Sequence, residues 1–276
     1  MFKILKKREL SDVVTLFEID AKDIARKAQP GNFFVLRIHE QGERIPLTIA
    51  DFDKERGTLT TVFQKVGKTT YHLGTLKEGD FILDVIGPLG IPSHIENLGK
   101  VICVGGGVGI APIYPITRAL KEVGNYIISI IGARTQNLLF WEDKMRKISD
   151  ELIITTDDGS YGRKAVVTIP LDELLQQEKD VKLVVAIGPT IMMKFVCKTT
   201  EKYNVKTIVS LNSIMVDATG ICGACRIEVG GETKFACVDG PEFDGHKVAF
   251  DLLMARQRMY LDEEKIAMDR YIDIKK

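Results

Sequence analysis

Five runs of almost uninterrupted apolar residues lie between positions 100 and 212, and they constrain the fold more than any other feature. The runs are KVICVGG, YIISIIGA, ELIITTD, KLVVAIG and KTIVSLN, and segments of helical character between them cover 112–123, 137–147 and 190–203. Strands that are apolar on both sides are typical of parallel sheets covered by helices on both faces. The alternation therefore predicts a doubly wound α/β domain over residues 98–211.

Residues 1–97 show a different pattern of short strands separated by turns. The runs VVTLFEI, FFVLRI, TLTTVFQKV and DFILDVI are rich in β-branched and aromatic residues, and AQPGN, EQGER and DKERG between them carry turn-forming residues. Several short strands at modest spacing predict a small antiparallel β-barrel. A chain of 276 residues has room for about two such domains. We assign residues 212–276, which hold the cysteine segment and a predicted helical tail, to a third, smaller region.

Charge and hydropathy exclude several classes of function. Lys plus Arg and Asp plus Glu both number 38, and this balance argues against a nucleic-acid-binding protein. The start, MFKILKKREL, lacks the apolar run of a signal peptide, and the longest charge-free segment, VICVGGGVGIAPIYPIT, contains glycines and prolines. We therefore expect no membrane segment and a cytoplasmic location, where clustered cysteines bind metal more often than they form disulfides.

A glycine-rich loop follows the first strand of the α/β region, at Gly105, Gly106, Gly107, Val108 and Gly109. Glycines let a backbone approach a diphosphate, and the following helix offers free N–H groups. The loop is not the G-x-G-x-x-G fingerprint, and by itself it also suits an ordinary strand-to-helix turn. However, IGART, TTDDGSYG and AIGPTIMM follow three later strands, which predicts a shared ligand crevice at the carboxyl ends of the sheet.

The segments GGGVGIAP and GPTIMM resemble the nicotinamide half of the ferredoxin–NADP reductase superfamily, in which a flavin-binding barrel precedes the nicotinamide domain. The resemblance implies that the glycine loop approaches the nucleotide diphosphate. It also implies that Gly188, Pro189 and Met192 lie near the nicotinamide. Many members have a cysteine where this chain has Ile187.

In the barrel, RIPLTIA resembles the isoalloxazine-binding strand of that superfamily, with Thr48 offering its hydroxyl to the flavin. The arginine of the family pattern falls on Ile45, so Arg44 either still reaches the flavin or is an ordinary surface arginine. The flavin contacts that the resemblance implies on this strand and the next are Pro46, Leu47, Thr48, Thr61, Val62 and Phe63.

A second barrel motif, VGKTTYHLGTLKEGD, resembles the glycine and threonine pair that binds the flavin diphosphate at a helix start. Gly67, Thr69 and Thr70 are the candidates. A plain helix N-cap by one of the threonines is the other interpretation, and the two are compatible.

Three of the five cysteines form the array Cys222-x2-Cys225-x11-Cys237. With His246 they would make a Cys3His zinc site. With Asp217 they read D-x4-C-x2-C-x11-C, which matches the plant-type [2Fe–2S] spacing with aspartate in place of the first cysteine. We favour the iron–sulfur interpretation with Asp217 as the fourth ligand, and we expect the other two cysteines, at 103 and 197, to be buried packing residues.

A reductase that carries such a module resembles two related groups. They are the electron-transfer subunits of dihydroorotate dehydrogenase and the small subunits of NADH-dependent ferredoxin–NADP oxidoreductases. Asp217 and the charged segment after Phe250 favour the second group. The resemblance implies electron transfer between NAD(H), FAD and a [2Fe–2S] cluster, in a heterodimer with a larger flavin and iron–sulfur subunit and, through it, with ferredoxin. A zinc-stabilised nucleotide-binding regulator is the non-enzymatic alternative.

The choice between NAD and NADP depends on residues that follow the second and third strands. Arg134 is placed to attract a 2′-phosphate, whereas Asp157 and Asp158 would repel it. The family resemblance favours NAD(H).

Overall fold

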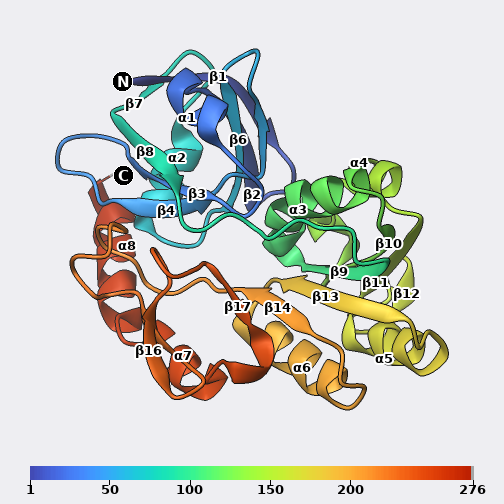
Figure 1. Ribbon diagram of the computed structural model, residues 1–276. Coiled ribbons are helices and arrows are strands. Elements are labelled where there is room, and N and C mark those ends of the chain that lie inside the picture. The colour runs from blue at the N-terminus through green and yellow to red at the C-terminus, as the bar shows by residue number, and fades with distance from the viewer. Residues whose placement is uncertain (275–276) are drawn as a thin grey trace.

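In the computed structural model, which describes residues 1–274, the amino-terminal strands form two antiparallel sheets around one core (Figure 1). The first sheet has the order β5-β6-β2-β1-β7 and the second has the order β4-β3-β8. Two short helices, α1 (Lys22–Lys27) and α2 (Lys68–Thr75), belong to this region. The strands are β1 (Phe2–Glu9), β2 (Val14–Asp20), β3 (Phe33–Arg37), β4 (Ile45–Thr48), β5 (Asp51–Asp53), β6 (Thr58–Gln64), β7 (Phe81–Ile82) and β8 (Asp84–Leu89).

The second region is the α/β domain, whose sheet has the order β12-β11-β10-β9-β13-β14-β17. All neighbours are parallel except β17, which pairs with β14 in the antiparallel sense. The chain runs outward from β9 on one side and restarts at β13 on the other, so the strand order reverses between these two. The strands are β9 (Lys100–Gly106), β10 (Tyr126–Ala133), β11 (Glu151–Thr156), β12 (Arg163–Lys164), β13 (Val181–Ile187) and β14 (Thr207–Ser210).

Helices cover both faces of this sheet, as Figure 1 shows. On one face lie α3 (Ile110–Glu122) and α4 (Glu142–Ile148), and on the other α5 (Thr168–Gln177) and α6 (Thr190–Glu201). The uninterrupted apolar runs of the sequence arise because these strands are buried on both sides. Cys103 and Cys197 are buried among apolar residues, as expected. The doubly wound fold is confirmed.

The helix predicted over 137–147 is wrong in its first part. A single 3-10 turn covers Gln136–Leu138, and α4 begins only at Glu142. Between them Trp141 has a left-handed backbone, with a φ of 59°, while its ring packs edge-on against Tyr114 of α3 at 5.3 Å between centroids. The helix therefore starts later than the local sequence pattern predicts, and Trp141 instead packs against α3.

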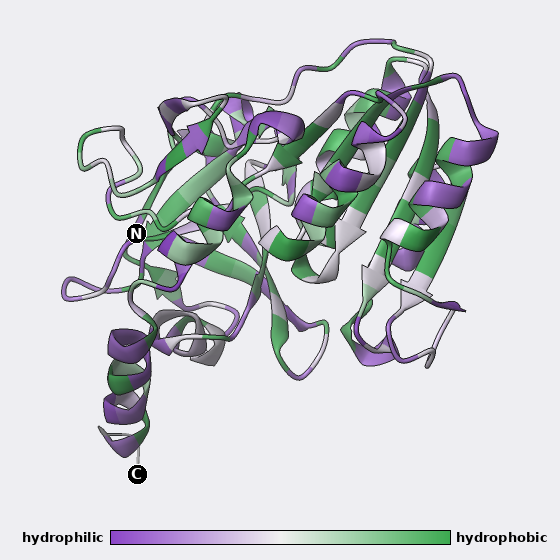
Figure 2. Ribbon diagram, turned by 90° about the horizontal axis from the view of Figure 1, so that it is seen from below, coloured by the Kyte–Doolittle hydropathy of each residue, from purple (hydrophilic) through white to green (hydrophobic). Residues whose placement is uncertain are grey.

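The carboxyl-terminal region is joined to the α/β domain by the sheet itself. After the cysteine loop come the hairpin β15 (Arg226–Val229) and β16 (Glu232–Phe235), then β17 (Glu242–Asp244), which extends the large sheet. The helices α7 (Phe250–Gln257) and α8 (Leu261–Ile274) follow. Figure 2 shows α8 at one edge of the molecule with a mostly hydrophilic surface. Its Tyr271 ring lies 5.9 Å from the His72 ring of α2, between centroids. No helix within residues 1–274 has both the length and the apolar character needed to cross a membrane.

Candidate functional site

A cavity of about 970 Å³ opens where the barrel, the α/β domain and the carboxyl-terminal region meet. It lies at the carboxyl ends of the parallel strands, where open α/β sheets bind ligands. Its volume is at the upper end of the range for small-molecule sites. The predicted site residues that line it are Pro46, Leu47, Thr48, Val62, Gly106, Gly107, Val108, Gly109, Arg134, Asp157, Gly188, Pro189 and Met192.

On the barrel side, strand alternation decides which side chains face the cavity. Val62 of β6 lines it. Its neighbours point into the barrel, because successive side chains in a strand face opposite sides. The Thr61 hydroxyl is buried and donates to the Thr48 carbonyl oxygen at 3.1 Å, and Phe63 packs edge-on against Phe17 at 5.2 Å between centroids. The side chains of these two candidates are therefore occupied within the barrel.

The predicted diphosphate motif forms the first turn of α2. The Thr70 hydroxyl accepts hydrogen bonds from the N–H groups of Val66 and Gly67, each at 3.1 Å. The Thr69 hydroxyl donates to the Glu43 carboxylate. The capping interpretation thus describes Thr70. Among the described residues 1–274, the lining of the 970 Å³ cavity includes neither this motif nor Arg44, which is exposed just before β4.

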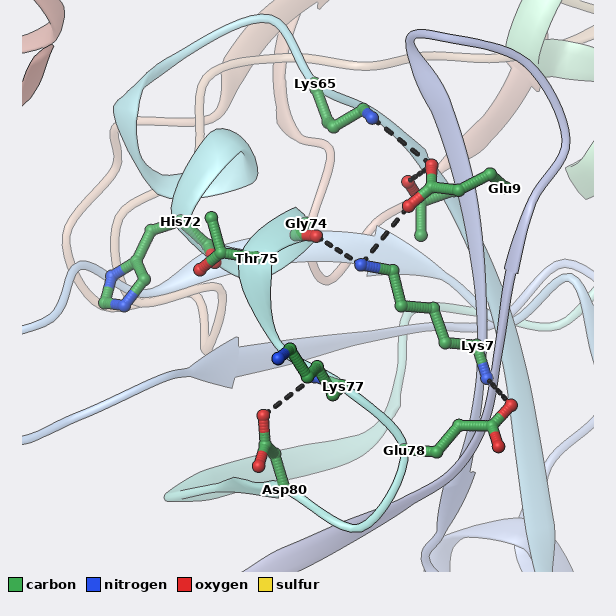
Figure 3. Close-up of polar contacts among 10 residues, drawn as sticks. Lys7, Glu9, Lys65, His72, Gly74, Thr75, Lys77, Glu78 and Asp80 are labelled. Carbon is green, nitrogen blue, oxygen red and sulfur yellow. Dashed lines mark hydrogen bonds and ion pairs between the residues drawn. The ribbon is translucent and has the colours of Figure 1, made fainter.

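The other end of α2 is tied to the barrel by the polar contacts in Figure 3. Lys7 Nζ donates to the Gly74 carbonyl oxygen at 2.5 Å and lies 3.2 Å from the Glu9 carboxylate. Lys65 and Thr15 also donate to Glu9, at 3.2 and 2.7 Å. Burial would raise the pKa of Glu9, but these hydrogen bonds lower it below its usual value. The helix that carries the predicted diphosphate motif is thereby fixed to β1.

The glycine loop needs residues without side chains, because the loops that follow β9 and β13 pack closely against each other. A Cβ atom on Gly106 would lie 2.2 Å from Met192 Sδ, and one on Gly109 would lie 2.1 Å from the Ile187 carbonyl oxygen. Gly107 instead has a φ of +55° and open space beside it. Two glycines therefore allow the β9–α3 loop to pack on the β13–α6 turn, and the third allows the turn itself. This is where the strand order reverses.

The wall formed by residues 210–215 was missed from sequence, because it has no glycine, although it follows a strand as the glycine-bearing loops do. Ser210, Asn212 and Ser213 line the cavity. Asn212 Oδ1 accepts from the Thr190 hydroxyl at 3.2 Å and from Gln257 Nε2 at 3.1 Å. The Ser213 hydroxyl oxygen is buried and has no hydrogen-bond partner among the described residues. A buried, unpaired hydroxyl beside a large cavity fits a polar ligand such as a flavin or nicotinamide nucleotide.

An ion cluster joins the barrel to the α/β domain beside the cavity. Asp51 of β5 accepts from Arg118 of α3 at 2.8 Å and from Lys144 of α4 at 3.1 Å. The Asp51 side chain is only 19% exposed. Arg118 also lies over the Tyr114 ring, at 5.3 Å from its centroid. These contacts fix the two halves of the cavity relative to each other.

The cysteine loop brings its candidate ligands together in two pairs. Cys225 and Cys237 are buried, and their Sγ atoms lie 3.2 Å apart. Burial, and then the neighbouring Cys225 thiol, raise the pKa of Cys237 to about 12. The Cys237 thiol is therefore protonated unless a metal displaces its proton.

Asp217 and Cys222 form the second pair. The Asp217 carboxylate accepts from the N–H groups of Thr219 at 2.9 Å and Cys222 at 3.0 Å. These hydrogen bonds, that from Thr219 first, hold the pKa of Asp217 below its usual value. The Ala224 N–H donates to Cys222 Sγ at 3.5 Å. An ionised carboxylate and an N–H group directed at sulfur suit a metal cluster.

No three His, Cys, Asp or Glu side chains within residues 1–274 converge as ligands of a single ion. A [2Fe–2S] cluster does not require this, because its four ligands are shared between two irons. The ring of His246, the alternative fourth ligand, lies with Nε2 2.9 Å from the Thr200 hydroxyl oxygen. Glycines 220 and 223, with φ of +85° and +68°, allow the left-handed backbone of the loop that carries Cys222 and Cys225. The two pairs fit a cluster with Asp217 as one ligand.

Comparison with known proteins gives matches for the cysteine region and for the whole chain. Residues 212–249 match the family model described as the iron–sulfur cluster binding domain of dihydroorotate dehydrogenase B. A Thermotoga maritima protein described as dihydroorotate dehydrogenase B (NAD(+)), electron transfer subunit homolog, is 52% identical over 270 residues, covering 98% of this chain and 95% of that protein.

Solved structures extend the likeness to the whole fold. One chain in the structure of an NADH-dependent reduced ferredoxin–NADP oxidoreductase is 51% identical, with a TM-score of 0.94 over 99% of this chain and 98% of that one. The Neisseria gonorrhoeae ferredoxin–NADP+ reductase, solved with FAD and NADP, is 17% identical, with a TM-score of 0.62 over 74% of this chain and 90% of that one. The Neisseria protein shows only that the fold is shared. Together with the 51% identical chain, it confirms the resemblance to the ferredoxin–NADP reductase superfamily.

Proposed function

The chain belongs to the family of electron transfer subunits of dihydroorotate dehydrogenase B, and from this premise we propose that it transfers electrons between NAD(H) and a larger partner subunit. When bound, FAD and a [2Fe–2S] cluster supply the conversion between the two-electron chemistry of NAD(H) and one-electron transfer. The protein holds these groups, orients NAD(H) and keeps water away from them. The observation that carries the proposal is the position of the cysteine loop, directly after the wall of the cavity.

Residues 210–215 are that link. Ser213 and Met215 line the cavity, and Asp217 begins the ligand array two residues later. No further domain therefore separates the proposed nucleotide and flavin site from the proposed cluster. This short connection supports a close approach of the two sites, which electron transfer between them requires.

In the cavity, the barrel wall would hold the flavin, and the crevice between β9 and β13 would hold the nicotinamide nucleotide. Pro46, Leu47, Thr48 and Val62 form the first wall. The glycine loop and the Gly188–Pro189 turn form the second. Because the two walls line one cavity, their residues would hold the nicotinamide nucleotide and the flavin close to each other, as hydride transfer needs. The apolar lining excludes water from that contact.

In the cluster site, Cys225 with Cys237 would ligate one iron, and Asp217 with Cys222 would ligate the other. The first pair is buried and the second is at the surface. The apolar side chains of Val216, Ile221 and Val238 are exposed near the second pair, by 59%, 86% and 42%. We infer that the larger flavin and iron–sulfur subunit of a heterodimer covers this side and exchanges electrons there.

The test is an electron paramagnetic resonance spectrum of the anaerobically purified chain, reduced with NADH and, separately, with dithionite. A rhombic [2Fe–2S] signal with both reductants supports the complete path from NAD(H) to the cluster. A signal with dithionite alone contradicts the NADH step. Zinc in place of iron contradicts the electron-transfer proposal and favours the structural zinc alternative.

The ligand assignment has its own test in the Asp217→Cys and Asp217→Ala variants. We expect Asp217→Cys to keep the iron and shift the reduction potential of the cluster, and Asp217→Ala to lose iron. Unchanged potential and iron content in both variants would remove Asp217 from the ligand set. Copurification of the tagged chain with its partner, followed by assays with dihydroorotate and with ferredoxin plus NADP, distinguishes the two related groups of complexes.

A further inference from the structure

The last turn of α7 contacts the cysteine loop through Arg256. Its Nη2 atom donates to the carbonyl oxygen of Ala224 at 3.2 Å, across 32 positions of sequence. Ala224 lies between Cys222 and Cys225, so the guanidinium is attached to the short turn that carries two of the proposed ligands. Arg256 is partly buried, whereas the next arginine, Arg258, is exposed.

The neighbouring residue binds the cavity wall. Gln257 Nε2 donates to the Asn212 carbonyl oxygen at 2.8 Å and to Asn212 Oδ1 at 3.1 Å. Two consecutive residues of one helix therefore contact the cluster turn and the wall of the nucleotide cavity. The helix is itself fixed, since Phe250 and Leu253 are buried in the core and the Ala249 N–H donates to the Glu228 carbonyl oxygen at 3.0 Å. The position of the guanidinium is thus set by packing.

The charge of Arg256 is directed at the cluster turn. No carboxylate within residues 1–274 lies within ion-pair distance of its side chain. A second cation, Arg226, lies with Nη1 3.5 Å from the Gly223 carbonyl oxygen, at the surface of the same turn. Two acidic groups of the cysteine segment have other contacts: Asp217 is a proposed ligand, and Asp239 accepts from the Phe235 N–H at 2.6 Å.

We propose that Arg256 is a positioning residue for the iron–sulfur cluster. Arg256 holds the Cys222–Cys225 turn in place and raises the reduction potential of the cluster. This inference depends on the proposed function, because it concerns the cluster. A reduced cluster carries one more negative charge than an oxidised one. A fixed cation close to it stabilises the reduced form, and partly buried charges are screened less than exposed ones.

The experiment measures the midpoint potential of the cluster by redox titration monitored by electron paramagnetic resonance, in the full chain. The variants are Arg256→Gln, which keeps a donor but removes the charge, Arg256→Lys, which keeps the charge, and Arg258→Gln as the control for an exposed arginine nearby. We expect a lower potential in Arg256→Gln, a value close to that of the unmodified protein in Arg256→Lys, and a smaller change in Arg258→Gln.

Equal potentials in Arg256→Gln and Arg258→Gln would overturn the inference. Iron content per chain gives a second readout. A loss of iron in Arg256→Gln that Arg256→Lys restores supports the role in holding the turn, whereas an equal loss in Arg258→Gln overturns it. If the unmodified protein contains no [2Fe–2S] cluster, the proposed function fails together with this inference. A normal cluster with an unchanged potential in Arg256→Gln rejects the inference alone.

Discussion

Replacing Gly109 with alanine tests the contact that brings the two halves of the nucleotide crevice together. The new Cβ atom would lie 2.1 Å from the Ile187 carbonyl oxygen and 2.8 Å from Gly188 Cα. Because real Cβ atoms come no closer than about 3.0 Å to other heavy atoms, the β9–α3 loop and the β13–α6 turn must separate by about 0.9 Å. Both contacts involve backbone, so no side-chain rotation relieves them. Overpacking of this kind costs about 1–3 kcal/mol of unfolding free energy.

The functional effect exceeds the effect on stability. A displacement of about 1 Å in a reacting geometry lowers rates by up to about 100-fold. We therefore expect Gly109→Ala to slow the reduction of bound flavin by NADH by about 10- to 100-fold, measured by stopped-flow loss of flavin absorbance. Urea unfolding of the same sample measures the change in stability.

The matched control is Gly74→Ala in α2. Its new methyl group would meet only the flexible Lys65 side chain, with Cδ at 2.7 Å, which can move aside. We expect this variant to keep the rate of flavin reduction. If Gly109→Ala reduced its flavin as fast as Gly74→Ala and unfolded at the same urea concentration, the packing explanation for this glycine would be wrong.

Three further predictions concern other parts of the molecule. Asp51→Asn breaks the ion cluster between the barrel and helices α3 and α4, and should lower the unfolding free energy by about 1–3 kcal/mol in urea titrations. The control Asp12→Asn, at an exposed position, should change it very little. Burial raises the pKa of Cys103 from 9.0 to about 12, so the folded state keeps a proton that the unfolded state loses. Stability should therefore fall above about pH 9, by about 1.4 kcal/mol per pH unit for this thiol, and Cys103→Ala should remove that part of the slope in unfolding measured across the range. In steady-state assays, kcat/KM should be higher for NADH than for NADPH. Asp157→Asn should raise kcat/KM for NADPH about fivefold, because it removes a repulsion of about 1 kcal/mol between the carboxylate and the 2′-phosphate. An unchanged kcat/KM for NADPH would place Asp157 away from the ribose phosphate.

The sequence alone determined those features that depend on residues close together in the chain. Strands buried on both sides require continuous apolar runs, so KVICVGG and YIISIIGA predicted a parallel sheet correctly. The spacing of Cys222, Cys225 and Cys237 likewise indicated an iron–sulfur region, and the family model covers the same segment. A turn that must surround a cluster is encoded within a few residues, and such patterns can be read directly.

Only the tertiary structure decided which distant segments meet. The sequence did not show that β17 would extend the large sheet beside β14, because an edge pairing is set by the packing of the whole module. It did not separate Val62, which faces the cavity, from Thr61, which is buried in the barrel, because the direction of each side chain follows from the strand register. Nor did it place Arg256 beside Ala224, 32 positions away. Local patterns fix the strands and helices, whereas burial of their shared apolar surface fixes their order, and that order creates the site.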